Sequence, residues 1–158
     1  MVYHGTTEIV RNPDVDHSYR QLDFGKGFYV TTVREQAERW ARRKAEILGR
    51  EKALINLYQM SDDFDGLHVK VFDEDLIEWI DFVCRCRDGV LDYLEYDLIL
   101  GKVANDKVFR VVDMYHAGIW DKERALKEIK VYPSYDQMAF ITQKAIDRLL
   151  TFETAEEV

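Results

Sequence analysis

The sequence predicts an α+β fold in a single domain spanning residues 1–158, and two observations carry this prediction. Short runs rich in β-branched and aromatic residues recur along the chain, and segments with helical periodicity separate some of them but not others. Such mixing without strict alternation favours α+β over a doubly wound sheet. No repeat, low-complexity tract or flexible linker divides the sequence, and a chain of this length can bury about two thirds of its surface.

The expected elements follow from these patterns. We expect strands over residues 2–4, 27–31, 53–58, 67–72, 96–103 and 135–141. We expect helices over residues 33–48, 75–87, 107–116, 121–129 and 142–150. The strand at 96–103 is nearly all apolar, which predicts a central place in its sheet. Thr142 is expected to cap the last helix, and the acidic tail at 153–158 either frays or adds an edge strand.

The helix after the second strand has clear start and stop signals. The sequence Thr32-Val33-Arg34-Glu35 has the form of a capping box, and Gly49 is a plausible C-cap after Leu48. The inward face is expected to hold Val33, Ala37, Trp40, Ala41 and Leu48. The same stretch is rich in arginine and lysine, which we interpret as a solvated helix face laced with ion pairs.

Composition excludes several classes of function. The formal net charge of −8 argues against bulk attraction to nucleic acid. No apolar run approaches the roughly 18 residues that span a bilayer, and the N-terminus lacks the pattern of a signal peptide, so we expect no membrane partner and a cytoplasmic location. Cys84 and Cys86 form a C-x-C pair, which we interpret as two reduced structural thiols and not as a metal site.

A glycine turn leads directly into the second strand. The turn is Asp23-Phe24-Gly25-Lys26-Gly27, and Tyr29 lies in the middle of the strand that follows. Glycines there allow positive φ or a close approach of the backbone to a ligand. The spacing matches neither a P-loop nor a dinucleotide-binding G-x-G-x-x-G, so the turn alone does not identify a ligand.

Two motifs together are more specific. Tyr3-His4-Gly5-Thr6 and the K-G-F-Y-x-T sequence at 26–31 resemble the NAD-binding core of the diphtheria-toxin-like and poly-ADP-ribose-polymerase-like ADP-ribosyltransferases. More narrowly, the chain resembles a family of small bacterial proteins of unknown function in that superfamily. The matching sequences are R-x-L-D-F-G-K-G-F-Y, Q-A-E-R-W-A, Y-D-x-x-x-G-x-V-A-N-D and the late D-Q-x-x-F. This resemblance implies a split β-sandwich with flanking helices, and NAD as a co-substrate without a metal.

The resemblance also implies roles for individual residues. His4 would bind a ribose hydroxyl of the adenosine half, and Gly5 would offer its backbone N–H and C=O to the nicotinamide carboxamide. Tyr29 would stack on the nicotinamide ring, with Trp40 as a second aromatic wall. The remaining NAD-binding positions would be Thr6, Arg20, Lys26 and Gly27, of which Arg20 and Lys26 are candidate pyrophosphate contacts.

The sequence departs from the superfamily at one catalytic position. The late strand carries Gln137 where a glutamate is expected. An amide can hold the ribose 2′-hydroxyl but brings no charge to an oxocarbenium-like state, a loss of about 10²–10³ in rate if oxyanion-hole deletions are a guide. Asp136 is adjacent but lies on the other face of the strand, so we place Gln137 in the site and keep Asp136 as the alternative. Asp97 and Asp106 are interpreted as structural.

Three functions remain open at this point. The leading hypothesis is an NAD-dependent mono-ADP-ribosyltransferase with His4, Tyr29 and Gln137 in the catalytic site. Its acceptor would be an intracellular macromolecule (protein, nucleic acid or nucleotide), and the chain is a candidate toxin of a toxin–antitoxin pair, with an antitoxin protein as partner. The alternatives are a catalytically weak or inactive NAD- or ADP-ribose-binding module, and an interaction protein without a nucleotide site.

Overall fold

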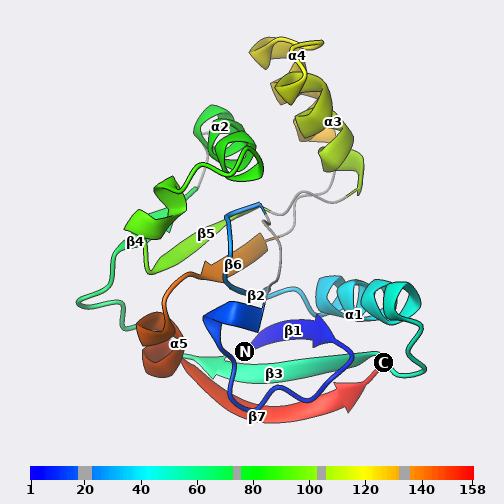
Figure 1. Cartoon of the computed structure of the whole chain (residues 1–158), viewed down its shortest axis with the longest axis vertical. Coiled ribbons are helices and arrows are strands. Elements are labelled where there is room, and N and C mark those ends of the chain that lie inside the picture. The colour runs from blue at the N-terminus through cyan, green and yellow to red at the C-terminus, as the bar shows by residue number, and fades with distance from the viewer. Residues whose placement is uncertain (18–22, 73–75, 103–105, 132–135) are drawn as a thin grey trace.

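The computed structural model describes residues 1–17, 23–72, 76–102, 106–131 and 136–158. Two β-sheets and five labelled helices form a mixed α+β architecture, which confirms the predicted class (Figure 1). The first sheet has the order β1-β3-β7 and consists of β1 (Val2–Thr6), β3 (Leu54–Met60) and β7 (Leu150–Glu157). The second has the order β2-β6-β5-β4 and consists of β2 (Phe28–Val30), β6 (Asp136–Phe140), β5 (Leu98–Lys102) and β4 (Val69–Val71).

Strand pairing is antiparallel throughout, except that β4 runs parallel to β5. The apolar strand β5 lies between β6 and β4, so its predicted central position is confirmed. The acidic tail forms the edge strand β7, which pairs with β3. Of the two alternatives predicted for this segment, a frayed end or an edge strand, the second is therefore confirmed. The helices are α1 (Arg34–Leu48), α2 (Leu76–Arg87), α3 (Asp106–His116), α4 (Lys122–Val131) and α5 (Gln143–Leu149).

Three clusters of buried side chains show how the sheets and helices pack on one another. Side chains on one face of the second sheet, including Phe28 and Val30, pack with Tyr58 of β3 and with α5, and this cluster fills the space between the two sheets. The opposite face of the second sheet, with Tyr29, belongs to a second cluster that continues into α2, α3 and α4. The outer face of the first sheet packs against the small residues of α1. In Figure 1, α1 flanks the first sheet, α2 lies near the second, and α3 and α4 extend away from it.

Helix α1 confirms part of its prediction and corrects the rest. Gly49 ends the helix in the left-handed region (φ 61°), and its N–H bonds to the carbonyls of the last turn. The capping box is wrong: Val33 is the N-cap without a side-chain cap, because the Thr32 hydroxyl bonds to Asp136 instead. The inward face is also shorter than predicted, since its buried stripe ends at Ala45 and Leu48 is 53% exposed.

The last helix begins as its sequence predicts. The Thr142 hydroxyl accepts a hydrogen bond from the Ala145 N–H (3.3 Å) at the N-cap of α5. The same hydroxyl donates to Asp97 (2.7 Å), which also accepts the N–H of His68 (2.8 Å). Burial would raise the pKa of Asp97, but these hydrogen bonds lower it below its usual value. Asp97 is therefore a structural acid, as interpreted from the sequence.

Candidate functional site

The two sheets meet at a single backbone bridge between β1 and β2. The Tyr3 N–H donates to the Thr31 carbonyl (2.8 Å), and the Thr31 N–H donates to the Tyr3 carbonyl (2.9 Å). If this antiparallel ladder continued, Gly5 would pair with Tyr29. Among the described residues it does not continue, so the strands separate at this point. Backbone groups of residues two apart in a strand point to the same neighbouring strand. Gly5 is two residues after Tyr3, so its N–H and C=O also point toward β2, into the space where the ladder has ended.

The His4 side chain on β1 contacts the backbone of β2 beside this separation. Its Nδ1 lies 2.7 Å from the Tyr29 carbonyl, which can only accept, so Nδ1 donates and carries the proton. The ring is buried and packs against Phe28, with ring centroids 4.4 Å apart. The predicted residues His4, Gly5 and Tyr29 therefore do lie together, where β1 and β2 part.

Three of the predicted residues share one face. Tyr3 is directly opposite Thr31, so the face of β1 that holds Gly5 continues into the face of β2 that holds Tyr29. Tyr29 is in turn opposite Ala139 of β6, and Gln137 lies two residues away on that strand. Gly5, Tyr29 and Gln137 thus belong to one continuous surface, which runs from the α1 side toward α2 and α3.

Gly5 is required for packing as well as being placed at the separation. A Cβ at this position would lie 2.0 Å from the Ala37 carbonyl oxygen of α1 and 2.9 Å from the Ala41 nitrogen. Gly27 is constrained in the same way, because a Cβ there would lie 2.6 Å from the Phe140 carbonyl oxygen. Both glycines of the two motifs allow close approach of neighbouring backbone, a reason that the sequence alone does not reveal.

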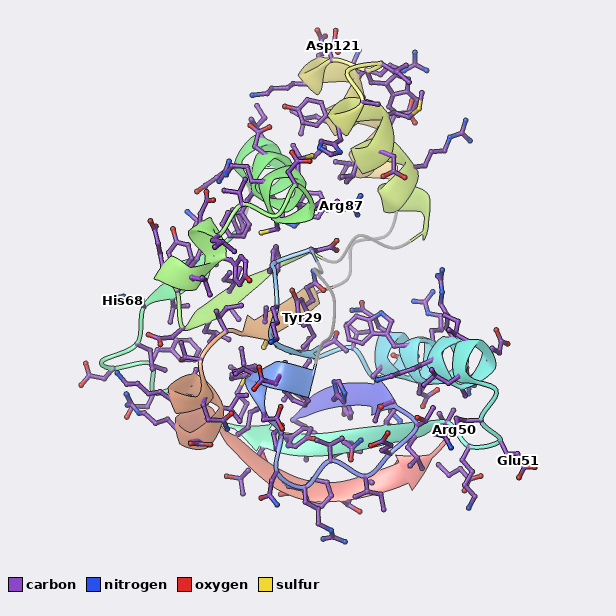
Figure 2. The ribbon with its side chains drawn as sticks, viewed as in Figure 1. Tyr29, Arg50, Glu51, His68, Arg87 and Asp121 are labelled. Carbon is purple, nitrogen blue, oxygen red and sulfur yellow. The ribbon has the colours of Figure 1, made fainter. Side chains whose placement is uncertain are left out.

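Tyr29 is more enclosed than a stacking platform in an open cleft. The residue is only 8% exposed and belongs to the buried cluster against α2. Its hydroxyl accepts the Phe24 N–H (3.0 Å) and donates to the Gly25 carbonyl, so the glycine turn folds over the ring's polar end. Burial, and secondly the charge of Asp23, raise the pKa of Tyr29 well above its usual value. Figure 2 shows Tyr29 in the middle of the molecule.

Asp136 and Gln137 take different partners, as strand alternation predicts. Asp136 accepts hydrogen bonds from the Thr31 hydroxyl (2.6 Å) and the Thr32 N–H (2.9 Å), so it fixes the connection between β2 and α1. Its carbonyl accepts the Gln36 amide (2.7 Å), while the other amide atom of Gln36, Oε1, is buried with no hydrogen-bond partner among the described residues. Asp136 is thus committed to structure, and Gln137 remains the residue of that strand on the Gly5 and Tyr29 face.

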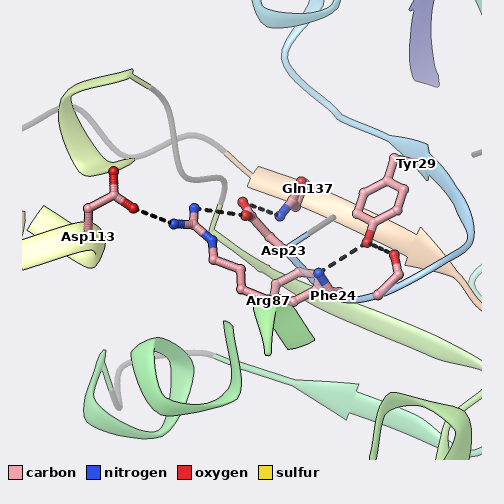
Figure 3. Close-up of polar contacts among 7 residues, drawn as sticks. Asp23, Phe24, Tyr29, Arg87, Asp113 and Gln137 are labelled. Carbon is pink, nitrogen blue, oxygen red and sulfur yellow. Dashed lines mark hydrogen bonds and ion pairs between the residues drawn. The ribbon is translucent and has the colours of Figure 1, made fainter. Parts of the chain in front are cut away.

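Gln137 belongs to a polar network, buried at the Asp23 end, that sequence reasoning missed (Figure 3). Its amide donates to the Asp23 carboxylate, with Nε2 3.4 Å from Oδ2. The other oxygen of Asp23 is 3.3 Å from Nη2 of Arg87, at the end of α2, and Nη1 of Arg87 is 3.0 Å from Asp113 of α3. Asp23 sits in the turn that the sequence singles out, but no local pattern distinguishes Arg87.

The other predicted site residues lie around this centre or outside it. Lys26 is on the surface and pairs with Asp16 (2.8 Å), which raises the pKa of Lys26. Thr6 is buried and accepts a hydrogen bond from Lys44 of α1 (3.2 Å). Trp40 is half-buried on α1. Arg20 lies outside the described residues, as does the side chain of Asp106, so the structure gives no account of either.

The structure also bears on metal binding, membrane spans, the two cysteines and a cavity. Within the described residues, no group of three or more His, Cys, Asp and Glu side chains could hold a metal, and no helix could cross a membrane. Cys84 and Cys86 are both buried and unpaired by a disulfide, and burial raises their pKa to about 11 and about 12. A cavity of about 320 Å³ lies elsewhere, between residues 11–14 and α5, and no predicted site residue lines it.

Comparison with known proteins gives a family but no activity. The model of a family described as a protein of unknown function (DUF3990) matches residues 1–152. The chain belongs to the DUF3990 family. No curated protein and no solved structure matches this DUF3990 protein. Its function must therefore be inferred from the geometry of the site.

The arrangement in this DUF3990 protein suits a small ligand with an amide group and a flat ring. The separated backbone edge at Gly5 offers one donor and one acceptor, Tyr29 offers an aromatic ring close by, and Gln137 offers an amide on the same face. These are hydrogen-bonding and stacking groups, and the Asp23 carboxylate brings a charge into contact with the Gln137 amide.

Proposed function

We propose that this DUF3990 protein is an NAD-dependent mono-ADP-ribosyltransferase with an ADP-ribosyltransferase-like split β-sandwich fold. The observation that carries the proposal is the break in the β1–β2 ladder, which leaves the Gly5 backbone facing Tyr29. A primary carboxamide has one face with an N–H donor and a C=O acceptor, so the nicotinamide amide can pair with Gly5 as a missing strand residue would. The resemblance of both motifs to the superfamily supports the same placement.

The proposed chemistry needs few groups. The bond between the nicotinamide nitrogen and ribose C1′ breaks, its electron pair stays on nicotinamide, and neutral nicotinamide leaves. The acceptor nucleophile then bonds to C1′ and releases its proton, to a base or to water. Tyr29 orients the leaving group and Gln137 holds a ribose hydroxyl, so positioning accounts for much of the expected acceleration. His4, whose Nδ1 is held by the Tyr29 carbonyl, would bind a hydroxyl of the adenosine ribose through its ring.

The turn at Asp23–Gly25 has a place in this proposal. It covers the hydroxyl end of Tyr29, and the ring is only 8% exposed. Full stacking of nicotinamide on the ring therefore requires this turn to move when NAD binds.

We propose an intracellular macromolecule as acceptor, and an antitoxin protein as partner if the chain acts as a toxin. Ion pairs on the basic helix α1 weigh against a nucleic-acid surface there. Arg34 pairs with Glu38 (3.0 Å) and with Glu156 of β7, and Arg42 is 3.7 Å from Glu38. These pairs agree with the solvated-face interpretation of that helix.

A second candidate function is an NAD- or ADP-ribose-binding module without turnover. The observation that favours it is the uncharged Gln137 at the position of the expected glutamate, with its amide turned to Asp23. Such a module would keep the Gly5 edge and the Tyr29 ring for binding, but it would release no nicotinamide.

Two measurements on the purified protein separate these functions. Calorimetry reports NAD binding, and chromatography reports nicotinamide release, with radiolabelled NAD and cell lysate used to find a labelled acceptor. We expect saturable binding and slow nicotinamide release, both lost in His4→Ala and Tyr29→Ala. Gln137→Ala is expected to keep binding and lose release, whereas Gln59→Ala, the same change at an exposed strand position, keeps both. Binding without release supports the module, and a protein that neither binds NAD nor releases nicotinamide refutes both candidates.

A further inference from the structure

We propose that Asp23 supplies the negative charge that Gln137 lacks, and that Arg87 holds the Asp23 carboxylate beside Gln137 for this purpose. The inference rests on the proposed function, because it assigns a role within the same site. Asp23 is not one of the positions to which the superfamily motifs gave a role. Its role is inferred from its hydrogen bond to Gln137.

The geometry places the carboxylate in a buried, oriented position. Asp23 is 7% exposed and Gln137 is 4% exposed. The two oxygens of Asp23 have different partners, Oδ2 with the Gln137 amide at 3.4 Å and Oδ1 with Arg87 Nη2 at 3.3 Å. Figure 3 shows Asp23 between the Arg87 guanidinium and the Gln137 amide. Two partners on separate oxygens fix the orientation of the carboxylate as well as its position.

The Arg87 guanidinium is not committed to Asp23 alone. Arg87 uses Nη1 for Asp113 and Nη2 for Asp23, so one guanidinium is shared by two carboxylates. Asp113 has a side chain that is 69% exposed and screened by water, whereas Asp23 is enclosed. A charge acts more strongly in such a low-dielectric site, so the carboxylate beside Gln137 is the one positioned to act on a ligand.

The carboxylate also lies close to the proposed nicotinamide platform. The N–H of Phe24, the next residue, donates to the Tyr29 hydroxyl (3.0 Å). After burial, the charge of Asp23 is the largest influence that raises the pKa of Tyr29, so its field reaches the ring's hydroxyl. Asp23 thus contacts the amide that would hold the ribose and adjoins the residue that binds the Tyr29 hydroxyl.

This position suits electrostatic stabilisation without proton transfer. As the bond from C1′ to the nicotinamide nitrogen breaks, its electron pair moves to nicotinamide and positive charge develops on the ribose. A fixed carboxylate nearby stabilises that charge and itself gains and loses no proton. Gln137 then has two tasks, to bind the ribose hydroxyl and to hold the acid that acts on the ribose.

A charge-exchange experiment tests the proposal by nicotinamide release from NAD. Asp23→Asn is expected to lower kcat by about 10²–10³ while KM for NAD changes little. Gln137→Glu is also expected to lower kcat, because it places a second carboxylate against Asp23 in a buried site. The double variant Asp23→Asn with Gln137→Glu moves the charge across the same contact, and its kcat should exceed that of Asp23→Asn at least tenfold. Asp62→Asn, in an exposed loop, is the matched control and should leave kcat unchanged.

The outcomes distinguish a chemical from a purely structural role. If Asp23 only anchors the turn to α2, Asp23→Asn lowers the melting temperature but leaves kcat of the folded protein intact, and the double variant gives no rescue. Should Asp23→Asn fail to fold, Gln137→Glu still decides, because a gain in kcat would mean that the site lacks a charge at position 137 and that Asp23 does not supply one. A wild-type protein without any nicotinamide release refutes the proposed function, and the role of Asp23 with it.

Discussion

Replacing Gly5 by alanine tests how β1 and α1 fit together. The new Cβ would lie 2.0 Å from the Ala37 carbonyl oxygen and 2.9 Å from the Ala41 nitrogen, and both are backbone atoms of α1 that cannot rotate away. Optimal separations between non-bonded heavy atoms are about 3.5 Å, so α1 must retreat by about 1.5 Å. That movement would loosen the alanines that pack α1 onto the first sheet.

The expected loss follows from overpacking with backbone displacement. Overpacked cores lose about 1–3 kcal/mol, and a rigid backbone neighbour places this site near 3 kcal/mol. For a chain of 158 residues, this corresponds to a decrease in Tm of about 6–12 °C. Because the clash involves no ligand, the loss should appear in full without NAD.

Urea unfolding of Gly5→Ala without NAD measures this loss, and Gly89→Ala is the matched control. Gly89 has φ 81° and open space around its missing Cβ, so alanine there meets only backbone strain of about 1–2 kcal/mol. We expect Gly5→Ala to be the less stable of the two. If Gly5→Ala unfolds at the wild-type urea concentration, α1 does not pack against β1 as described.

Three further predictions concern other residues. Asp136→Ala should lower the free energy of unfolding by about 1–3 kcal/mol, and Asp136→Asn by less, in urea titrations; equal stability of all three proteins would contradict the structural role. Tyr29→Phe leaves the buried N–H of Phe24 without its acceptor, so it should lower stability by about 1–3 kcal/mol yet keep NAD binding in calorimetry, which Tyr29→Ala should lose. Burial raises the pKa of Cys84 and Cys86 from 9.0 to about 11 and about 12, so the folded state holds these protons more tightly. The contribution of the two thiols to stability should therefore be constant below about pH 9 and be lost as pH rises from 9 toward 11–12; a flat urea midpoint across that window would refute the burial.

Local signals predicted most of the elements. The apolar run of β5, the glycine that ends α1 and the threonine that caps α5 each depend on residues close in sequence, and each is found as predicted. The capping box failed for a non-local reason, since the Thr32 hydroxyl finds Asp136, which lies 104 residues away. Sequence patterns cannot report a competitor at that distance.

In the candidate site, too, features set by neighbouring residues were predicted and features set by distant contacts were not. Strand alternation separated Gln137 from Asp136 correctly, because it is a local property of β6. The packing of Gly5 against Ala37 and the contact of Asp23 with Arg87 depend on how α1 and α2 dock, which no motif encodes. The proposed roles of His4, Tyr29 and Gln137 in NAD chemistry stay predictions, although the fold gathers all three at the junction of the two sheets.

A crystal structure of the protein soaked with NAD tests the central claim most directly. We predict nicotinamide between β1 and β2, with its carboxamide paired to the N–H and C=O of Gly5, its ring against Tyr29, and the attached ribose facing Gln137 and Asp23. NAD bound elsewhere, such as in the cavity between residues 11–14 and α5, would contradict the proposed site. So would a ribose that faces Asp136 instead of Gln137.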